Sequence, residues 1–221
     1  MRASPAHPPG TPPADLAGAS GEEMVILEVC RGREGGCPNA LLDTGPWRAA
    51  LAEWLERDQV HLRLRRRLGR RPVLYHHKLR IALAGCPNGC SRPQIADLAL
   101  VGTVRPALEP GDCLGCGECV ESCPDRAITL EDELPRFQDQ LCLGCLSCQQ
   151  ACPQECISLS PPAARLLVAG KLGRHPHLAR EVARVERPEQ AVELMAAEVE
   201  RYLRHSRPGT RFAAWWLAQR G

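Results

Sequence analysis

Residues 113–124 read CLGCGECVESCP, and residues 142–153 read CLGCLSCQQACP. Both segments follow the pattern Cys-x2-Cys-x2-Cys-x3-Cys-Pro, and the second copy begins 29 residues after the first, at 142 against 113. Short apolar runs follow the two Cys-Pro dipeptides at equivalent places, residues 127–130 and 156–159. The pattern predicts one pseudo-symmetric unit of two equivalent halves, over about residues 106–160.

The spacing of these eight cysteines is that of the bacterial ferredoxin run, whose thiolates hold [4Fe–4S] clusters. In two-cluster versions, three close cysteines bind one cluster and the fourth binds the other. The expected ligands of one cluster are Cys113, Cys116, Cys119 and Cys152, and those of the other are Cys142, Cys145, Cys148 and Cys123.

Disulfides and zinc are the alternative uses of these cysteines. Disulfides need an oxidising compartment, and residues 1–21 lack the apolar stretch of a secretory signal peptide. Zinc sites usually pair two Cys-x2-Cys units, whereas each segment here links three cysteines and ends in Cys-Pro. The pattern favours iron–sulfur clusters and a cytoplasmic, largely anaerobic setting.

Composition excludes several classes of function. The formal net charge of +2 over 221 residues points to neither nucleic acid nor a membrane surface. The arginines of residues 63–71 are expected on a solvated helix face. No apolar run approaches the roughly 20 residues that span a bilayer. The length suits one sizeable domain, or one domain plus a small insert.

Hydrophobic periodicity and turn residues predict an α+β fold. Residues 1–21 are expected to be a disordered Pro-rich tail, and residues 60–68 fit either a strand or a short helix. Because strand patterns flank the repeat, residues 22–105 and 161–221 are expected to form one host domain, into which residues 106–160 are inserted. The expected strands are 24–29, 73–83, 95–104 (one strand or a pair) and 165–169, and the expected helices run from Asp43 or Thr44 to about Arg57, from 188 to about 205 with an apolar stripe of Ala191, Leu194, Met195, Val199 and Leu203, and from 211 to 220.

Four further cysteines lie outside the repeat, as two separated pairs: Cys30 with Cys37, and Cys86 with Cys90. Placed at strand ends, four thiolates could hold a third [4Fe–4S] cluster. A tetrahedral zinc site is the alternative. The thirteenth cysteine, Cys156, lies outside all three ligand sets and is expected to be a buried structural thiol.

Three segments resemble the sulfite and nitrite reductase family, particularly its dissimilatory and anaerobic members. Residues 85–90, GCPNGC, followed by IADL at 95–98, resemble the second cysteine motif of that family. Residues 78–81, KLRI, resemble its basic-x-basic segment. Residues 170–176, GKLGRHP, resemble the Gly-Lys-x-Gly-Arg segment that follows the ferredoxin insert in those members.

The resemblance implies a sirohaem coupled to a [4Fe–4S] cluster of Cys30, Cys37, Cys86 and Cys90, with Cys90 bridging to the sirohaem iron. Lys78 and Arg80 would bind the anionic substrate, and Lys171 and Arg174 would bind the cofactor. The implied reaction is the six-electron reduction of sulfite to sulfide, or of nitrite, with electrons fed through the ferredoxin clusters by a donor protein. The alternative is an iron–sulfur electron-transfer subunit without sirohaem or its own substrate site.

Two features depart from the family pattern. The first cysteine loop is Cys-x6-Cys rather than Cys-x5-Cys, a difference that Gly35 and Gly36 can absorb. The family's N-terminal half, with arginines for the macrocycle and the substrate, has no counterpart in the 29 residues before Cys30. A partner subunit or a second copy would then supply the missing wall, or fewer contacts would hold the cofactor, or only clusters would be bound.

Overall fold

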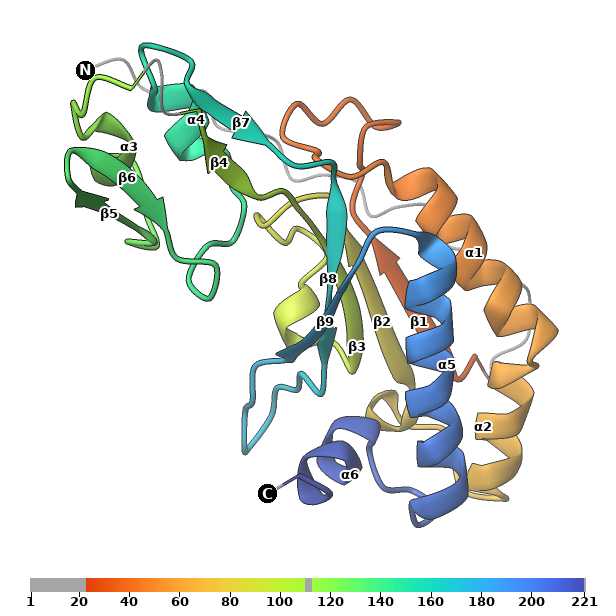
Figure 1. The fold of residues 1–221 in the computed structure, drawn as a ribbon. Helices are drawn as coiled ribbons and strands as arrows, with labels where there is room; N and C mark the ends of the chain where they lie inside the picture. The colour runs from red at the N-terminus through yellow and green to blue at the C-terminus, as the bar shows by residue number, and fades with distance from the viewer. Residues whose placement is uncertain (1–22, 110–112, 221) are drawn as a thin grey trace, which may run out of the picture.

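A five-stranded mixed sheet organises residues 23–109 and 113–220, the residues that the computed structural model describes. The tail expected at residues 1–21 lies outside this range. Strands β1, β2 and β3 run parallel, and β8 and β9 continue the sheet in antiparallel pairing (Figure 1). The order across the sheet is β1 (Val25–Val29), β2 (Leu79–Ala84), β3 (Leu98–Thr103), β8 (Ala163–Val168) and β9 (Arg180–Val185).

Helices α1 (Thr44–Arg57), α2 (Val60–Leu68) and α5 (Pro188–His205) cover one face of the sheet (Figure 1). The Asp43 side chain caps α1 by accepting the N–H of Gly45 at 3.1 Å. The main core lies between these helices and the sheet, with Trp54 and Met195 almost fully buried. The expected α5 stripe is confirmed except at Leu194, which is 39% exposed.

The ambiguous segment at residues 60–68 is the helix α2. Val60, Leu64 and Leu68 are buried at a spacing of four residues, whereas Leu62 is 41% exposed. Helical spacing therefore accounts for the burial, and strand alternation does not.

The arginines of this region were expected only to face solvent, but two of them contact α5. Arg67 stacks 4.5 Å from the centre of the Tyr202 ring and donates to its hydroxyl at 3.3 Å. Arg63 forms an ion pair with Glu200. Both partners belong to α5, so this arginine cluster fastens α2 to α5.

Two strand predictions need correction. The strand expected from residue 73 begins only at Leu79, where pairing with Val25 of β1 starts, and Tyr75–His77 form a short 3-10 turn, η1. Strand β9 was not expected, because its exposed edge position carries charged side chains that hide the alternation. A second 3-10 turn, η2 (Pro93–Ile95), precedes β3, and α6 (Phe212–Ala218) closes the chain. No helix of the described ranges is long and apolar enough to cross a membrane.

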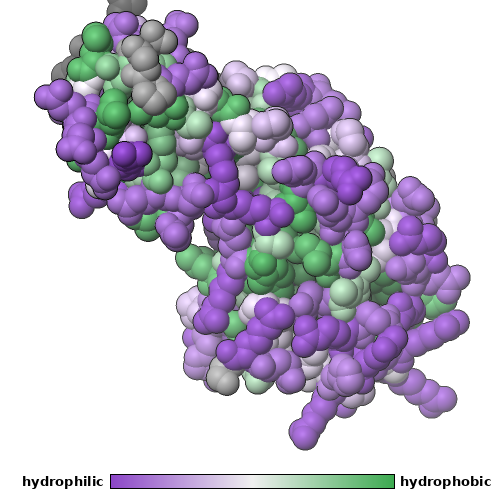
Figure 2. Space-filling view, viewed as in Figure 1, coloured by the Kyte–Doolittle hydropathy of each residue, from purple (hydrophilic) through white to green (hydrophobic). Residues whose placement is uncertain are grey.

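Residues 106–159 leave the sheet after β3 and return to it at β8; we call them the cysteine-rich segment. This segment lies beside the sheet (Figure 1), and Figure 2 shows apolar residues on its surface. Leu114, Leu130 and Leu141 are among the exposed apolar residues of the segment. Among the described residues of this segment, Cys119, Ile128 and Ile157 form one buried cluster. Its elements are β4 (Pro106–Leu108) paired with β7 (Ile157–Leu159), β5 (Ile128–Glu131) paired with β6 (Leu134–Phe137), and the short helices α3 (Glu118–Glu121) and α4 (Ser147–Ala151).

Candidate iron–sulfur sites

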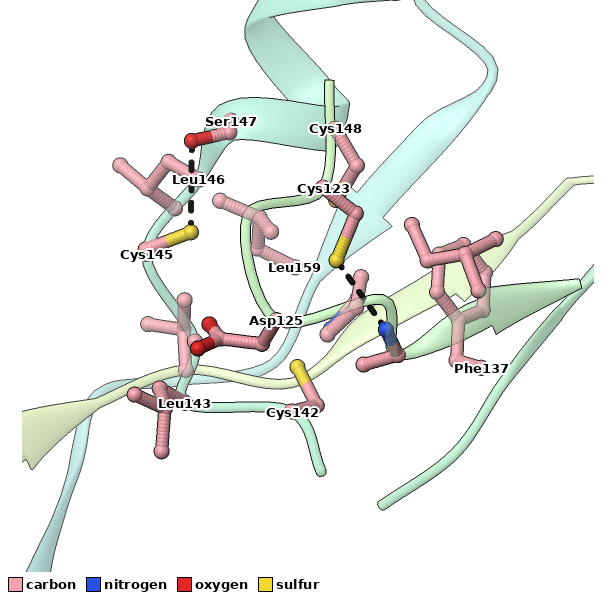
Figure 3. Close-up of a pocket in the computed structure, with 15 residues that line it drawn as sticks. Cys123, Asp125, Phe137, Cys142, Leu143, Cys145, Leu146, Ser147, Cys148 and Leu159 are labelled. Atoms are coloured by element: carbon pink, nitrogen blue, oxygen red, sulfur yellow. Dashed lines mark hydrogen bonds between the residues drawn. The ribbon is translucent and has the colours of Figure 1, made fainter. Parts of the chain in front are cut away.

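The cysteine-rich segment contains two cavities lined by cysteines. The first, which we call the inner cavity, is lined by three cysteines of the second repeat and one of the first (Figure 3). The Ala127 N–H donates to the Cys123 sulfur at 3.3 Å, and the Cys145 thiol donates to the Ser147 hydroxyl at the same distance. The four cysteines are Cys123, Cys142, Cys145 and Cys148.

The second, outer cavity has the reciprocal composition. Three cysteines of the first repeat and one of the second line it, namely Cys113, Cys116, Cys119 and Cys152. The structure thus brings together the two sets of four that the sequence pattern predicts. Cys156 also lines the outer cavity, although the sequence analysis placed this residue outside every ligand set.

Burial governs the acidity of these thiols. It raises the pKa of Cys148 to about 11 and raises the pKa values of Cys119 and Cys142, because thiolates lose hydration there. At Cys152 burial acts in the same direction, but hydrogen bonds from the Cys156 thiol and nearby backbone N–H groups outweigh it and lower the pKa. Cys119, Cys142 and Cys148 therefore need a bound cation to become thiolate ligands near neutral pH.

The remaining four cysteines gather at the carboxyl ends of β1 and β2. Cys30 follows β1, and its sulfur accepts the N–H of Gly85 at 3.1 Å. Burial first, and then the like charges of Cys37, Cys30 and Cys90, raise the pKa of Cys86, so the four groups share one electrostatic environment. Asn88 donates its side-chain amide to the Cys90 sulfur at 3.3 Å.

Close backbone contacts connect this third site to the inner cavity. A Cβ atom on Gly102 would lie 2.3 Å from the Gly85 carbonyl oxygen, so β3 and the loop before Cys86 touch directly. The Thr103 hydroxyl donates to the Leu143 carbonyl at 3.0 Å. Gly85 and Leu143 each neighbour a cysteine, Cys86 and Cys142, so only a few residues separate the two sites.

The two expected substrate cations do not form a free pair on one strand face. Lys78 precedes β2, at the end opposite to Cys86, and no described carboxylate lies within ion-pair distance of it. Arg80 is only 7% exposed and forms an ion pair with Glu28 at 3.0 Å. Glu28 also forms an ion pair with Arg92. The Arg80 Nε–H is buried and has no hydrogen-bond partner in the described chain.

The loop that carries Lys171 and Arg174 packs against the chain that follows Cys90. The Gly170 N–H donates to the Ala96 carbonyl, and the Ala179 N–H donates to the Gln94 carbonyl, both at 2.8 Å. A Cβ atom on Gly170 would lie 2.6 Å from those same two carbonyl oxygens, so only glycine fits. The predicted cofactor-binding cations therefore lie on a loop adjoining the third cysteine site.

The fully buried Asp97 was not singled out from the sequence. Its carboxylate accepts the backbone N–H groups of Arg80 at 3.0 Å and of Ala213 at 3.2 Å, and the Arg211 guanidinium lies 3.5 Å away. Burial raises its pKa, while these donors and the arginine charge oppose the shift. Asp97, which directly precedes β3, thus holds together β2 and α6 through hydrogen bonds to Arg80 and Ala213.

Within residues 23–109 and 113–220, no three His, Cys, Asp or Glu side chains converge tightly enough to hold a single metal ion. A four-iron cluster binds each thiolate at a different iron, so its ligands surround a wider space. The donor chemistry of the cysteines that line each cavity fits such clusters.

The fold and its cysteine sites are those of an iron–sulfur protein. The chain belongs to the nitrite and sulphite reductase 4Fe-4S domain family, whose model matches residues 25–221. It is therefore a member of a [4Fe–4S] domain family.

The curated relatives that the chain matches are named as sulfite reductases. The chain is 35% identical over 118 residues, 53% of its length, to a coenzyme F420-dependent sulfite reductase of Methanocaldococcus jannaschii. It is 37% identical over 57 residues, 26% of its length, to an anaerobic sulfite reductase subunit of Salmonella typhimurium. The match spans 16% of the length of each of these relatives.

Among solved structures, the crystal structure of dissimilatory sulfite reductase I (DsrI) has a similar fold. The TM-score is 0.58 at 18% sequence identity, over 89% of this chain and 50% of that one. At this identity the likeness concerns the fold.

Proposed function

We propose that this chain is a sulfite (or nitrite) reductase component with three [4Fe–4S] clusters, two of them in an inserted ferredoxin-type domain at residues 106–160. The observation that carries the proposal is the reciprocal lining of the two cavities, each with three cysteines of one repeat and one of the other. The ligand sets are Cys113, Cys116, Cys119 and Cys152; Cys142, Cys145, Cys148 and Cys123; and Cys30, Cys37, Cys86 and Cys90.

The backbone contacts suggest the order in which electrons pass. The inner cavity is lined in part by Val104, the residue that follows β3 by one position, whereas the lining of the outer cavity includes no residue of the host domain. A donor protein would therefore deliver electrons to the outer cluster. They would pass to the inner cluster, and the Thr103–Leu143 and Gly102–Gly85 contacts lead on to the third site.

For the third site we propose sirohaem, with Cys90 as the bridging thiolate. Its donor set fits this group: Cys90 is exposed and can reach a second metal, and Lys171 and Arg174 on the neighbouring loop can bind macrocycle carboxylates. When bound, the iron macrocycle and its cluster supply one-electron storage next to the substrate. The chain spans 16% of the curated relatives' lengths, and a partner subunit or second copy would complete the pocket.

We propose Lys78 and Arg80 as the substrate cations. Sulfite is a small oxyanion, so charged donors lower the cost of bringing it out of water. Arg80 offers a buried Nε–H without a partner in the described chain, and the Glu28 pair fixes the orientation of its guanidinium. Lys78 adds a charge that no described carboxylate neutralises.

The visible spectrum of the anaerobically purified protein tests the sirohaem proposal. Sirohaem gives sharp Soret and red bands that clusters alone do not produce. If those bands stay absent after sirohaem and candidate partners are supplied, the electron-transfer interpretation replaces the reductase one. About twelve iron atoms and twelve acid-labile sulfides per chain support three clusters. About eight of each, together with one zinc ion, contradict the third cluster.

The substrate role is tested by Lys78→Ala, with Arg201→Ala as the matched control. Arg201 is a half-exposed cation on α5, so its loss removes the same charge from the helical face of the sheet. Slower sulfite-dependent turnover in Lys78→Ala alone, with unchanged iron content, supports the assignment. Equal kinetics in the two variants refute it.

A further inference from the structure

The outer cavity holds one thiol more than a four-iron cluster needs. The Cys156 sulfur lies 3.4 Å from the Cys152 sulfur, within hydrogen-bond distance. Cys156 is 5% exposed and lines the cavity together with Cys113, Cys116 and Cys119. A fifth potential ligand therefore already faces the metal site.

The inner cavity provides the internal comparison. Advancing 29 residues takes Cys123 to Cys152 and Ala127 to Cys156. The two turns have the same backbone, since Arg126 and Glu155 both adopt φ +51° and donate N–H bonds back to the preceding cysteine carbonyl at 3.3 and 3.2 Å. Ala127 lines the inner cavity as Cys156 lines the outer one.

We propose that Cys156 is a reserve ligand of the outer cluster, able to replace Cys152 at the same iron. This inference rests on the proposed clusters. In the exchange, the iron–sulfur bond to Cys152 breaks and one to Cys156 forms, while the proton of the Cys156 thiol passes to the Cys152 sulfur. No electron is gained or lost. The two sulfur atoms lie within hydrogen-bond distance and either can be the donor, so the proton can pass directly between them.

The equivalence of the turns explains why only one half has this property. In the inner half a methyl group occupies the reserve position, so loss of Cys123 leaves one iron without a protein thiolate. In the outer half, loss of Cys152 leaves a thiol in the same cavity. The outer cluster is then the better protected of the two, which suits the one that would meet a donor protein.

The test compares iron and acid-labile sulfide in anaerobically purified full-length variants, with electron paramagnetic resonance of the oxidised and reduced protein. Cys152→Ala should keep about twelve irons per chain, and Cys152→Ala/Cys156→Ala should fall to about eight. Cys123→Ala should also fall to about eight, and adding Ala127→Cys to it should restore about twelve.

The outcomes separate this inference from the proposed function. If wild-type protein lacks a cluster at the outer site, the proposed function fails. If wild-type protein has it but Cys152→Ala loses four irons, or gives the oxidised-state signal of a [3Fe–4S] cluster, the reserve ligand is refuted. Retention of the cluster in the double variant also refutes it, because another ligand must then be acting. The restoring Ala127→Cys variant shows that a lost cluster reflects a missing thiolate rather than misfolding.

Discussion

Substituting Gly102 with alanine tests whether the contact between β3 and the loop before Cys86 is as close as the structure indicates. The new Cβ would lie 2.3 Å from the Gly85 carbonyl oxygen and 2.8 Å from the Leu42 Cβ. Ordinary van der Waals contact begins at 3.4 Å, so the backbones must separate by about 1 Å. Neither obstacle is the flexible end of a side chain, and Gly85 also accepts the N–H groups of Leu41 and Leu42.

Overpacking of this kind costs about 1–3 kcal/mol. For a chain of this size, each kcal/mol lowers the melting temperature by about 2–4 °C, so we expect a decrease of about 2–12 °C. The same separation lengthens the proposed electron route, so an electron that dithionite delivers to the inner cluster should reach a still-oxidised third cluster more slowly. Differential scanning calorimetry of the cluster-loaded protein measures the first effect, and freeze-quench spectroscopy measures the second.

Gly45→Ala is the matched control, since it adds the same methyl group elsewhere. Its Cβ would lie 2.6 Å from the carboxylate end of the exposed Glu34 side chain, which can move away, and at an ordinary 3.5 Å from Asp43 Oδ1, in the first turn of α1. Alanine there should be neutral or stabilise the protein by about 0.5–1 kcal/mol. A Gly102→Ala melting temperature equal to or above that of Gly45→Ala would refute the close contact.

Four further predictions follow from the same contacts. Asp97→Ala should lower the free energy of unfolding by about 3 kcal/mol or more, because it leaves the buried N–H groups of Arg80 and Ala213 without an acceptor and Arg211 without its carboxylate. Because burial raises the pKa of Asp97 above its ordinary 3.8, its native-state proton stabilises the fold at low pH and that contribution is lost as pH rises through the native pKa. The melting temperature of wild type relative to Asp97→Asn should therefore fall over that pH range, and a constant difference would contradict this. Thr103→Val should cost about 1–2 kcal/mol by leaving the Leu143 carbonyl unpaired, measured by urea unfolding with Thr129→Val, an exposed strand position, as control. Arg67→Met should lower stability by about 1–2 kcal/mol, while Arg57→Met, whose exposed partner is its chain neighbour, should have little effect. Iron removal by a chelator should raise hydrogen exchange across residues 106–159 far more than in β2 and β3, whereas equal exchange would show that the segment folds without clusters.

Helices α1 and α5 could be predicted because their determinants are local. Asp43 caps α1, apolar residues recur at helical spacing, and α5 runs over the predicted residues, Pro188–His205. Strand limits depend on partners far along the chain. β2 begins where Val25 offers a partner, and the edge strand β9 exists because β8 pairs with it.

The cysteines that line each cavity were also predictable, because the repeat contains its own symmetry and the cavities follow it, while their role as cluster ligands stays a prediction. The position of Cys156 was not inferred, although the sequence contained the relevant comparison. Residues 29 apart occupy equivalent places, and Ala127 is the counterpart of Cys156. The ion pair between Arg80 and Glu28 joins two strands in three dimensions, so the basic-x-basic pattern alone could not reveal that Arg80 is buried.

The close contacts at the base of the cysteine-rich segment serve structure and the proposed electron route together. A Cβ atom on Gly144 would lie 2.3 Å from the Val104 carbonyl oxygen and 2.4 Å from the Thr103 hydroxyl, just as Gly102 leaves no room against Gly85. Side chains at either glycine would hold the cysteine sites apart. The described buried cluster of the segment has three residues, so these backbone contacts, and the proposed metal ligands, would fix its position. The features that fix the segment on β3 are therefore also those that bring Cys142 near Cys86.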